Sequence, residues 1–102
     1  MTTRTIRYTL LDGNALPDGT PTRAAMDRLV DAVADALAAA FPGAEVTVDV
    51  ARRTSGYSRP AHLGWDADYR DEELAEATIQ RAWEAWANTV TDEDYERPEV
   101  TR

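Results

Sequence analysis

The stretch Thr22–Val50, TRAAMDRLVDAVADALAAAFPGAEVTVDV, decides the fold. Apolar residues recur at helical spacing in its first part, with alanines along the edges of the stripe, which predicts an amphipathic helix. Thr20 or Thr22 can cap this helix, which we expect to begin near Pro21. The pair Pro42-Gly43 ends it, because proline cannot continue a helix and glycine favours the turn that follows. The predicted core stripe consists of Met26, Leu29, Val30, Val33, Leu37 and Phe41.

Strands are predicted on either side of this helix. Valines alternate with polar residues over Glu45–Val50, and Thr3–Leu11 shows the same alternation of apolar and polar residues. A strand–helix–strand order favours parallel pairing through a right-handed crossover. If the two strands are neighbours, Arg7 can pair with Glu45 or Asp49 across the sheet.

A second amphipathic helix is predicted after residue 68. Asp68 or Asp71 can cap it, and acidic residues in its first turn suit the positive end of the helix dipole. Its apolar face includes Trp83 and Trp86, which are three residues apart and are expected to pack in the core. Between the second strand and this helix, we expect a long turn or arm and a short third strand at Ala61–Trp65.

The order of these elements is β-α-β-(β)-α. It predicts an α+β two-layer sandwich, with the two amphipathic helices on one face of a small sheet. A chain of 102 residues fits one such domain, which we expect over residues 1–90, followed by an acidic, frayed tail over residues 91–102.

The composition excludes several kinds of site. The chain has no cysteine, which excludes disulfides and thiolate ligands, and its single histidine, His62, excludes a site with two imidazoles. It has no apolar run of transmembrane length and no signal-peptide core, so we expect a cytoplasmic protein of a bacterial or phage-infected cell. Ser55, Ser58 and Asp66 accompany His62 without a nucleophile elbow or phosphate loop, so neither catalysis nor a metal or cofactor is predicted.

Charge is the most informative feature of the sequence. The formal net charge is −8, from 19 acidic residues and 11 basic residues, all of which are arginine. Residues 1–65 hold seven acids and seven arginines, whereas residues 66–102 hold twelve acids and four arginines, which accounts for the whole excess. Such asymmetry indicates an acidic interaction surface or a solubilising face. It also disfavours nucleic-acid binding by the arginines and aromatic residues of the segment 52–65.

Two sets of carboxylates are candidates for partner binding. Asp27, Asp31 and Asp35 repeat every four residues and form a row with steps of about 6 Å along the first helix. Like charges at this spacing repel by a few tenths of a kcal/mol per pair, and Arg23 and Arg28 compensate only in part. The row is either a device that imitates phosphates or an ordinary solvated face. The second set lies on the second helix and consists of Glu72, Glu73, Glu76 and Glu84.

The order of elements and several anchors resemble the DinI family, small modulators of the RecA recombinase. The anchors are Ala40-Phe41-Pro42, the strand Val46–Ala51 and the segment Ile79–Glu84, and the likeness extends over residues 4–88 in outline. The resemblance implies a β-α-β-β-α fold whose acidic last helix binds RecA by imitating single-stranded DNA. Carried over to this chain, that role falls on Glu72, Glu73, Glu76 and Glu84.

The sequence therefore predicts a small acidic, non-enzymatic protein that occupies a basic, nucleic-acid-binding surface of a partner protein, such as a RecA-type recombinase. A phage-encoded anti-defence inhibitor of a nuclease or surveillance complex would use the same physics. The alternative of another class is a small oligomeric assembly protein whose acidity only keeps it in solution.

Overall fold

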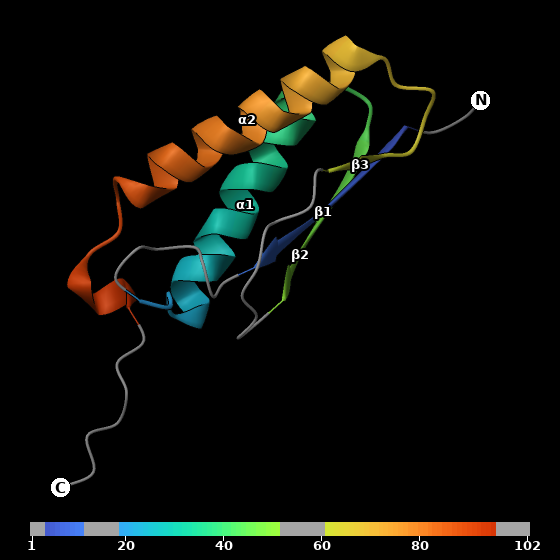
Figure 1. Cartoon of the computed structure of the whole chain (residues 1–102). Helices are drawn as coiled ribbons and strands as arrows, with labels where there is room; N and C mark the ends of the chain where they lie inside the picture. The colour runs from blue at the N-terminus through green and yellow to red at the C-terminus, as the bar shows by residue number, and fades with distance from the viewer. Residues whose placement is uncertain (1–3, 12–18, 52–60, 96–102) are drawn as a thin grey trace, which may run out of the picture.

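The structure is a computed structural model, and it describes residues 4–11, 19–51 and 61–95. It confirms the small α+β fold (Figure 1). Within the described residues the order of elements is β1 (Thr5–Leu11), α1 (Arg23–Ala40), β2 (Glu45–Ala51), β3 (His62–Leu63), α2 (Tyr69–Ala87) and a 3₁₀ turn (Asp92–Asp94).

The sheet has β1 at its centre, in the order β2-β1-β3. β1 and β2 are parallel, as the strand–helix–strand order predicts, and β3 pairs with β1 in the antiparallel sense over two residues. Arg7 lies opposite Thr47 on β2, so Glu45 and Asp49 are its diagonal neighbours. The expected cross-strand ion pair of Arg7 is not formed among the residues that the structure describes.

The core lies between one face of the sheet and both helices. The alternation in β1 buries Ile6, Tyr8 and Leu10 on that face. In Figure 1 the two helices lie next to each other, and the strands lie together on one side of this helix pair. The helices and the C-cap residue of α1, Phe41, contribute further core residues, which are Ala25, Met26, Leu29, Val33, Leu37, Phe41, Ala75, Ile79, Ala82 and Trp86.

Each helix begins at a cap that the sequence offers. Thr22 caps α1, because its hydroxyl accepts the backbone N–H of Ala25 at 3.2 Å. α1 therefore begins at Arg23, two residues after the expected start. Asp68 caps α2 in a reciprocal capping box with Asp71, whose carboxylate also accepts the indole N–H of Trp65 at 3.2 Å.

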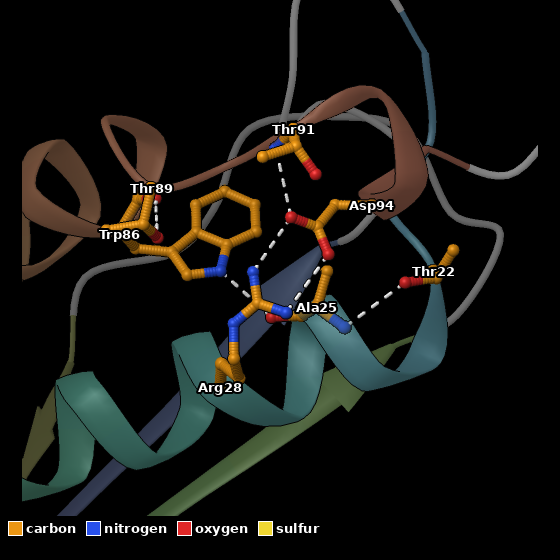
Figure 2. A network of polar contacts seen from close by, with 7 residues as sticks. All are labelled: Thr22, Ala25, Arg28, Trp86, Thr89, Thr91 and Asp94. Carbon is orange, nitrogen blue, oxygen red and sulfur yellow. Dashed lines mark hydrogen bonds and ion pairs between the residues drawn. The ribbon is translucent and has the colours of Figure 1, made fainter.

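The segment Thr91–Tyr95 corrects the prediction of a frayed tail from residue 91. These residues form a 3₁₀ turn that returns to the start of α1 (Figure 2). The backbone N–H of Thr22 donates to the carbonyl of Asp94 at 2.7 Å, and Tyr95 forms an antiparallel bridge with Pro21. The residues from 96 to 102, to which the same prediction applies, lie outside the described part of the chain.

Within the described residues, neither α1 nor α2 has the length and apolar character that a membrane crossing requires.

Candidate partner-binding surface

The carboxylate row of α1 lies on the side of the helix opposite the core. The buried residues of α1 fall on one stripe, and Asp27, Asp31 and Asp35 are exposed on the other side of the helix. Residues four apart on a helix are neighbours, so the three carboxylates follow one line with steps of about 6 Å. Within the described ranges, none of the three takes part in an ion pair.

Arg28, which lies beside this row, is engaged elsewhere. Arg28 donates from both terminal nitrogens to the carboxylate of Asp94, at 3.0 and 2.9 Å (Figure 2). This contact holds the pKa of Asp94 well below its ordinary value, at about 2, and raises that of Arg28. The expected compensation of the row by Arg28 is therefore weakened, because its guanidinium is paired with a different carboxylate.

The four glutamates of α2 are also exposed, but they lie on a different flank of the helix pair. Thr78 lies on the side of α2 that faces α1, because it lines the same groove as Ala36 of α1. At 3.6 residues per turn, Glu72, Glu73, Glu76 and Glu84 lie roughly 120–160° around α2 from Thr78. Asp27, Asp31 and Asp35 likewise lie roughly 100–180° around α1 from Ala36. The seven predicted carboxylates thus form two separate surfaces.

Among these glutamates, Glu84 has a local partner. It accepts a hydrogen bond from the side-chain amide of Gln80 at 3.1 Å. This bond orders the carboxylate without neutralising it, since the amide carries no charge. Glu84 therefore remains an exposed negative group near the C-terminal end of α2, where the helix dipole does not favour it.

The groove between α1 and α2 is a feature that the sequence analysis missed. Its volume is about 540 Å³, and it is open to solvent. Leu74 is 39% exposed, whereas the side chain of Thr78 is buried, and its hydroxyl has no hydrogen-bond partner among the described residues. A signal was present, because Leu74, Thr78 and Arg81 recur at helical spacing beside the predicted core stripe. The lining residues are Ala36, Ala39, Ala40, Leu74, Thr78, Arg81 and Ala82.

The candidates for other chemistry are only partly described. His62 and Asp66 are exposed, and Ser55, Ser58 and the arginines of the segment 52–60 lie outside the described residues. Trp65 is engaged in packing: its ring lies 5.6 Å from that of Phe41, and the guanidinium of Arg4 lies 5.5 Å from its centre. In the described ranges, no three His, Asp or Glu side chains converge as metal ligands.

Comparison with known proteins does not supply a family for this chain. No protein-family model matches it, and neither a curated protein nor a solved structure does. The charge distribution and the contacts described above are therefore the basis for inferring its function.

Proposed function

We propose that the protein is a small acidic binding module that occupies the basic, nucleic-acid-binding surface of a partner protein. The observation that carries this proposal is the row Asp27, Asp31 and Asp35, exposed on α1 and without an ion pair in the described part of the chain. Its neighbour Arg28 is held by Asp94, so the row presents its charge to a partner.

The electrostatics of the whole chain support this function. A net charge of −8 on 102 residues attracts a basic surface over a distance of about one Debye length, roughly 8–10 Å at physiological salt. Attraction of this kind speeds association and is weakened by salt. Aligned carboxylates at regular steps offer a basic groove the kind of charge pattern that a phosphate backbone offers.

The partner that we propose first is a RecA-type recombinase, on the strength of the resemblance to the DinI family. That resemblance assigns the contact to Glu72, Glu73, Glu76 and Glu84 on α2, whereas the regular line of three exposed carboxylates favours the row on α1. Because the two sets lie on different flanks of the helix pair, they can be removed separately.

Competition for single-stranded DNA tests the proposal. A fluorescent oligonucleotide is bound to a purified RecA-type recombinase, and the protein is added at low salt and at ~0.5 M salt, where the Debye length is several Å. We expect displacement of the oligonucleotide at low salt and at least tenfold weaker displacement at high salt. No displacement at either salt overturns the recombinase as partner.

Two matched variants locate the contact. One carries Asp27→Asn, Asp31→Asn and Asp35→Asn, and the other carries Glu73→Gln, Glu76→Gln and Glu84→Gln. Each removes three negative charges, so a difference between them reports position and not net charge. We expect the α1 variant to lose displacement at least tenfold while its urea midpoint stays close to that of the parent protein. A loss confined to the α2 variant assigns the contact to α2. Displacement by both variants that is as strong as that of the parent protein contradicts a site at either surface.

A further inference from the structure

Among the described residues, the edge of β2 that faces away from β1 has backbone groups without a partner strand. The backbone N–H of Glu45 donates to the carbonyl of Arg4 at 2.8 Å, and the strands stay in register to Ala51. In a parallel ladder only alternate residues of a strand bond to a given neighbour, so Glu45, Thr47 and Asp49 face β1. The N–H and C=O groups of Val46, Val48 and Val50 then point outward, and no described strand lies on that side of β2.

An apolar strip lies beside these free groups. The side chains of Val46, Val48 and Val50 are on the core face of the sheet but are only half-buried. α1 packs over β2, and its flank away from α2 carries Val30 and Ala34, which are half-buried as well. A further strand placed along β2 would cover this strip, because alternate side chains of that strand would point to the same face.

Carboxylates lie on both sides of the strip. Glu45 and Asp49 are exposed on the outer face of the sheet, and Asp27 and Asp31 are exposed on α1 close to the flank that carries Val30 and Ala34. Long exposed edge strands usually carry lysine, proline or a bulge that blocks pairing. β2 has seven residues, EVTVDVA, without lysine or proline.

We propose that this edge of β2 binds an extended, basic segment of a partner protein as an added strand. Its apolar side chains would lie on Val46, Val48 and Val50, and its arginine or lysine side chains would alternate with them toward Glu45 and Asp49. Recognition of this kind draws affinity from main-chain hydrogen bonds and specificity from alternate side chains. A second copy of this chain fits the edge less well, since antiparallel pairing of two β2 strands gathers four like charges on one face.

Hydrogen exchange with a peptide probe tests the added strand directly. The probe is a terminally blocked eight-residue peptide with alternating arginine and valine, and the control peptide has glutamate in place of arginine. In the complex with the arginine peptide, we expect amide exchange at Val46, Val48 and Val50 to slow at least tenfold. The glutamate peptide should cause no slowing. Binding of the arginine peptide without slower exchange at these three amides overturns the proposal.

Val48→Pro removes an outward N–H while the ladder to β1, which uses Thr47 and Asp49, keeps its bonds. Proline is tolerated in an edge strand at such a position, so we expect the fold to persist and peptide affinity to fall at least tenfold. Glu45→Gln with Asp49→Asn provides a second variant in case the proline unfolds β2, and it should weaken the arginine peptide at least fivefold. Unchanged affinity in this second variant contradicts the proposed role of the carboxylates.

This proposal goes beyond the acidic surfaces of the helices and can fail separately from them. If the peptide slows amide exchange only at Asp27, Asp31 and Asp35 or only at the α2 glutamates, strand addition is overturned and the helical surface is the binding site. Slower exchange at Val48 that depends on protein concentration without peptide would show that a second copy pairs there, and this outcome also overturns it. Failure of the recombinase competition has no effect on the peptide result.

Discussion

Arg28 and Asp94, 66 residues apart in the sequence, form an ion pair with two parallel hydrogen bonds, at 3.0 Å (Nη1–Oδ1) and 2.9 Å (Nη2–Oδ2). The carboxylate of Asp94 also accepts a hydrogen bond from the backbone N–H of Thr91 at 3.0 Å. The backbone carbonyl of Asp94 accepts a hydrogen bond from the backbone N–H of Thr22. One acidic residue of the C-terminal region thus fastens the chain to the first turns of α1. It is also the contact that takes Arg28 away from the carboxylate row.

The first prediction concerns the pH dependence of stability. The pKa of Asp94 is lowered from an ordinary 3.8 to about 2, chiefly by its hydrogen bonds to Arg28. Since the folded state has the lower pKa, the contribution of this group is fully present above about pH 4 and is lost as the pH falls toward 2. We expect Asp94→Asn to lower the urea midpoint at pH 7 and to reduce the loss of stability between pH 4 and pH 2.

Asp35→Asn is the matched control for this prediction, because Asp35 is exposed on α1 and has no ion pair among the described residues. Its stability should follow the pH dependence of the parent protein over the same interval. If Asp94→Asn has the same slope between pH 4 and pH 2 as the parent, the pair does not contribute to stability in solution.

The second prediction concerns Trp86, whose indole N–H donates to the carbonyl of Ala25 at 2.9 Å within the core. Trp86→Phe removes this bond and part of a buried ring, so it should cost about 2–3 kcal/mol of unfolding free energy. Trp83 meets Trp86 edge to face at 5.8 Å but is only half-buried. Trp83→Phe should therefore cost about 1 kcal/mol. Equal losses in urea denaturation would contradict the anchoring role of the Trp86 bond.

The fold could be predicted because local sequence patterns, such as hydrophobic periodicity and capping residues, indicate its helices and strands. The period of 3.6 in α1 and of two in β2 distinguishes helix from strand, and Pro42-Gly43 separates them. The candidate caps Thr22 and Asp68 lie directly before the apolar stripes, as their function requires. β3 is shorter than predicted: it contains only His62 and Leu63, and the chain bends at Gly64 and Trp65 after a last backbone hydrogen bond from Gly64 to Thr5.

The candidate site could be predicted only in part. Periodicity places Asp27 and Glu73 on the outer faces of their own helices, but it does not tell how two helices are rotated against each other. That rotation, which depends on how alanines of α1 meet Thr78 of α2, puts the two acidic sets on different flanks. The Arg28–Asp94 pair could not be predicted, because many arginine–carboxylate pairings are compatible with the same composition and only the folded chain selects one.

The third prediction concerns Thr78, which is 5% exposed and whose hydroxyl has no hydrogen-bond partner in the part of the chain that the structure describes. Burial of an unpaired hydroxyl costs about 1–3 kcal/mol, and valine has nearly the same shape and helix propensity. Thr78→Val should therefore raise the unfolding free energy by about 1 kcal/mol. Thr78→Ser keeps the hydroxyl and loses the methyl group, so this substitution should lower the unfolding free energy. A destabilised valine variant in urea denaturation would indicate that the hydroxyl has a partner in solution.

The last prediction concerns the close approach of β1 and the residue that follows β3. The backbone N–H of Gly64 donates to the carbonyl of Thr5 at 2.7 Å. A Cβ on Gly64 would collide with the hydroxyl of Thr5 and lie 3.3 Å from its carbonyl oxygen. Gly64→Ala should thus lower the unfolding free energy by about 1–2 kcal/mol, as overpacking does.

A double-mutant cycle with Thr5→Ala separates this collision from other effects of the glycine. Thr5→Ala removes the colliding hydroxyl. Alone it should lower the unfolding free energy, because alanine is a weaker strand former than threonine, but by less than about 1 kcal/mol, because Thr5 is only half-buried. If the collision accounts for the loss, Gly64→Ala should be less destabilising in the Thr5→Ala background by at least about 0.5 kcal/mol. Additive losses would mean that the backbone of residue 64, and not its distance from Thr5, requires glycine.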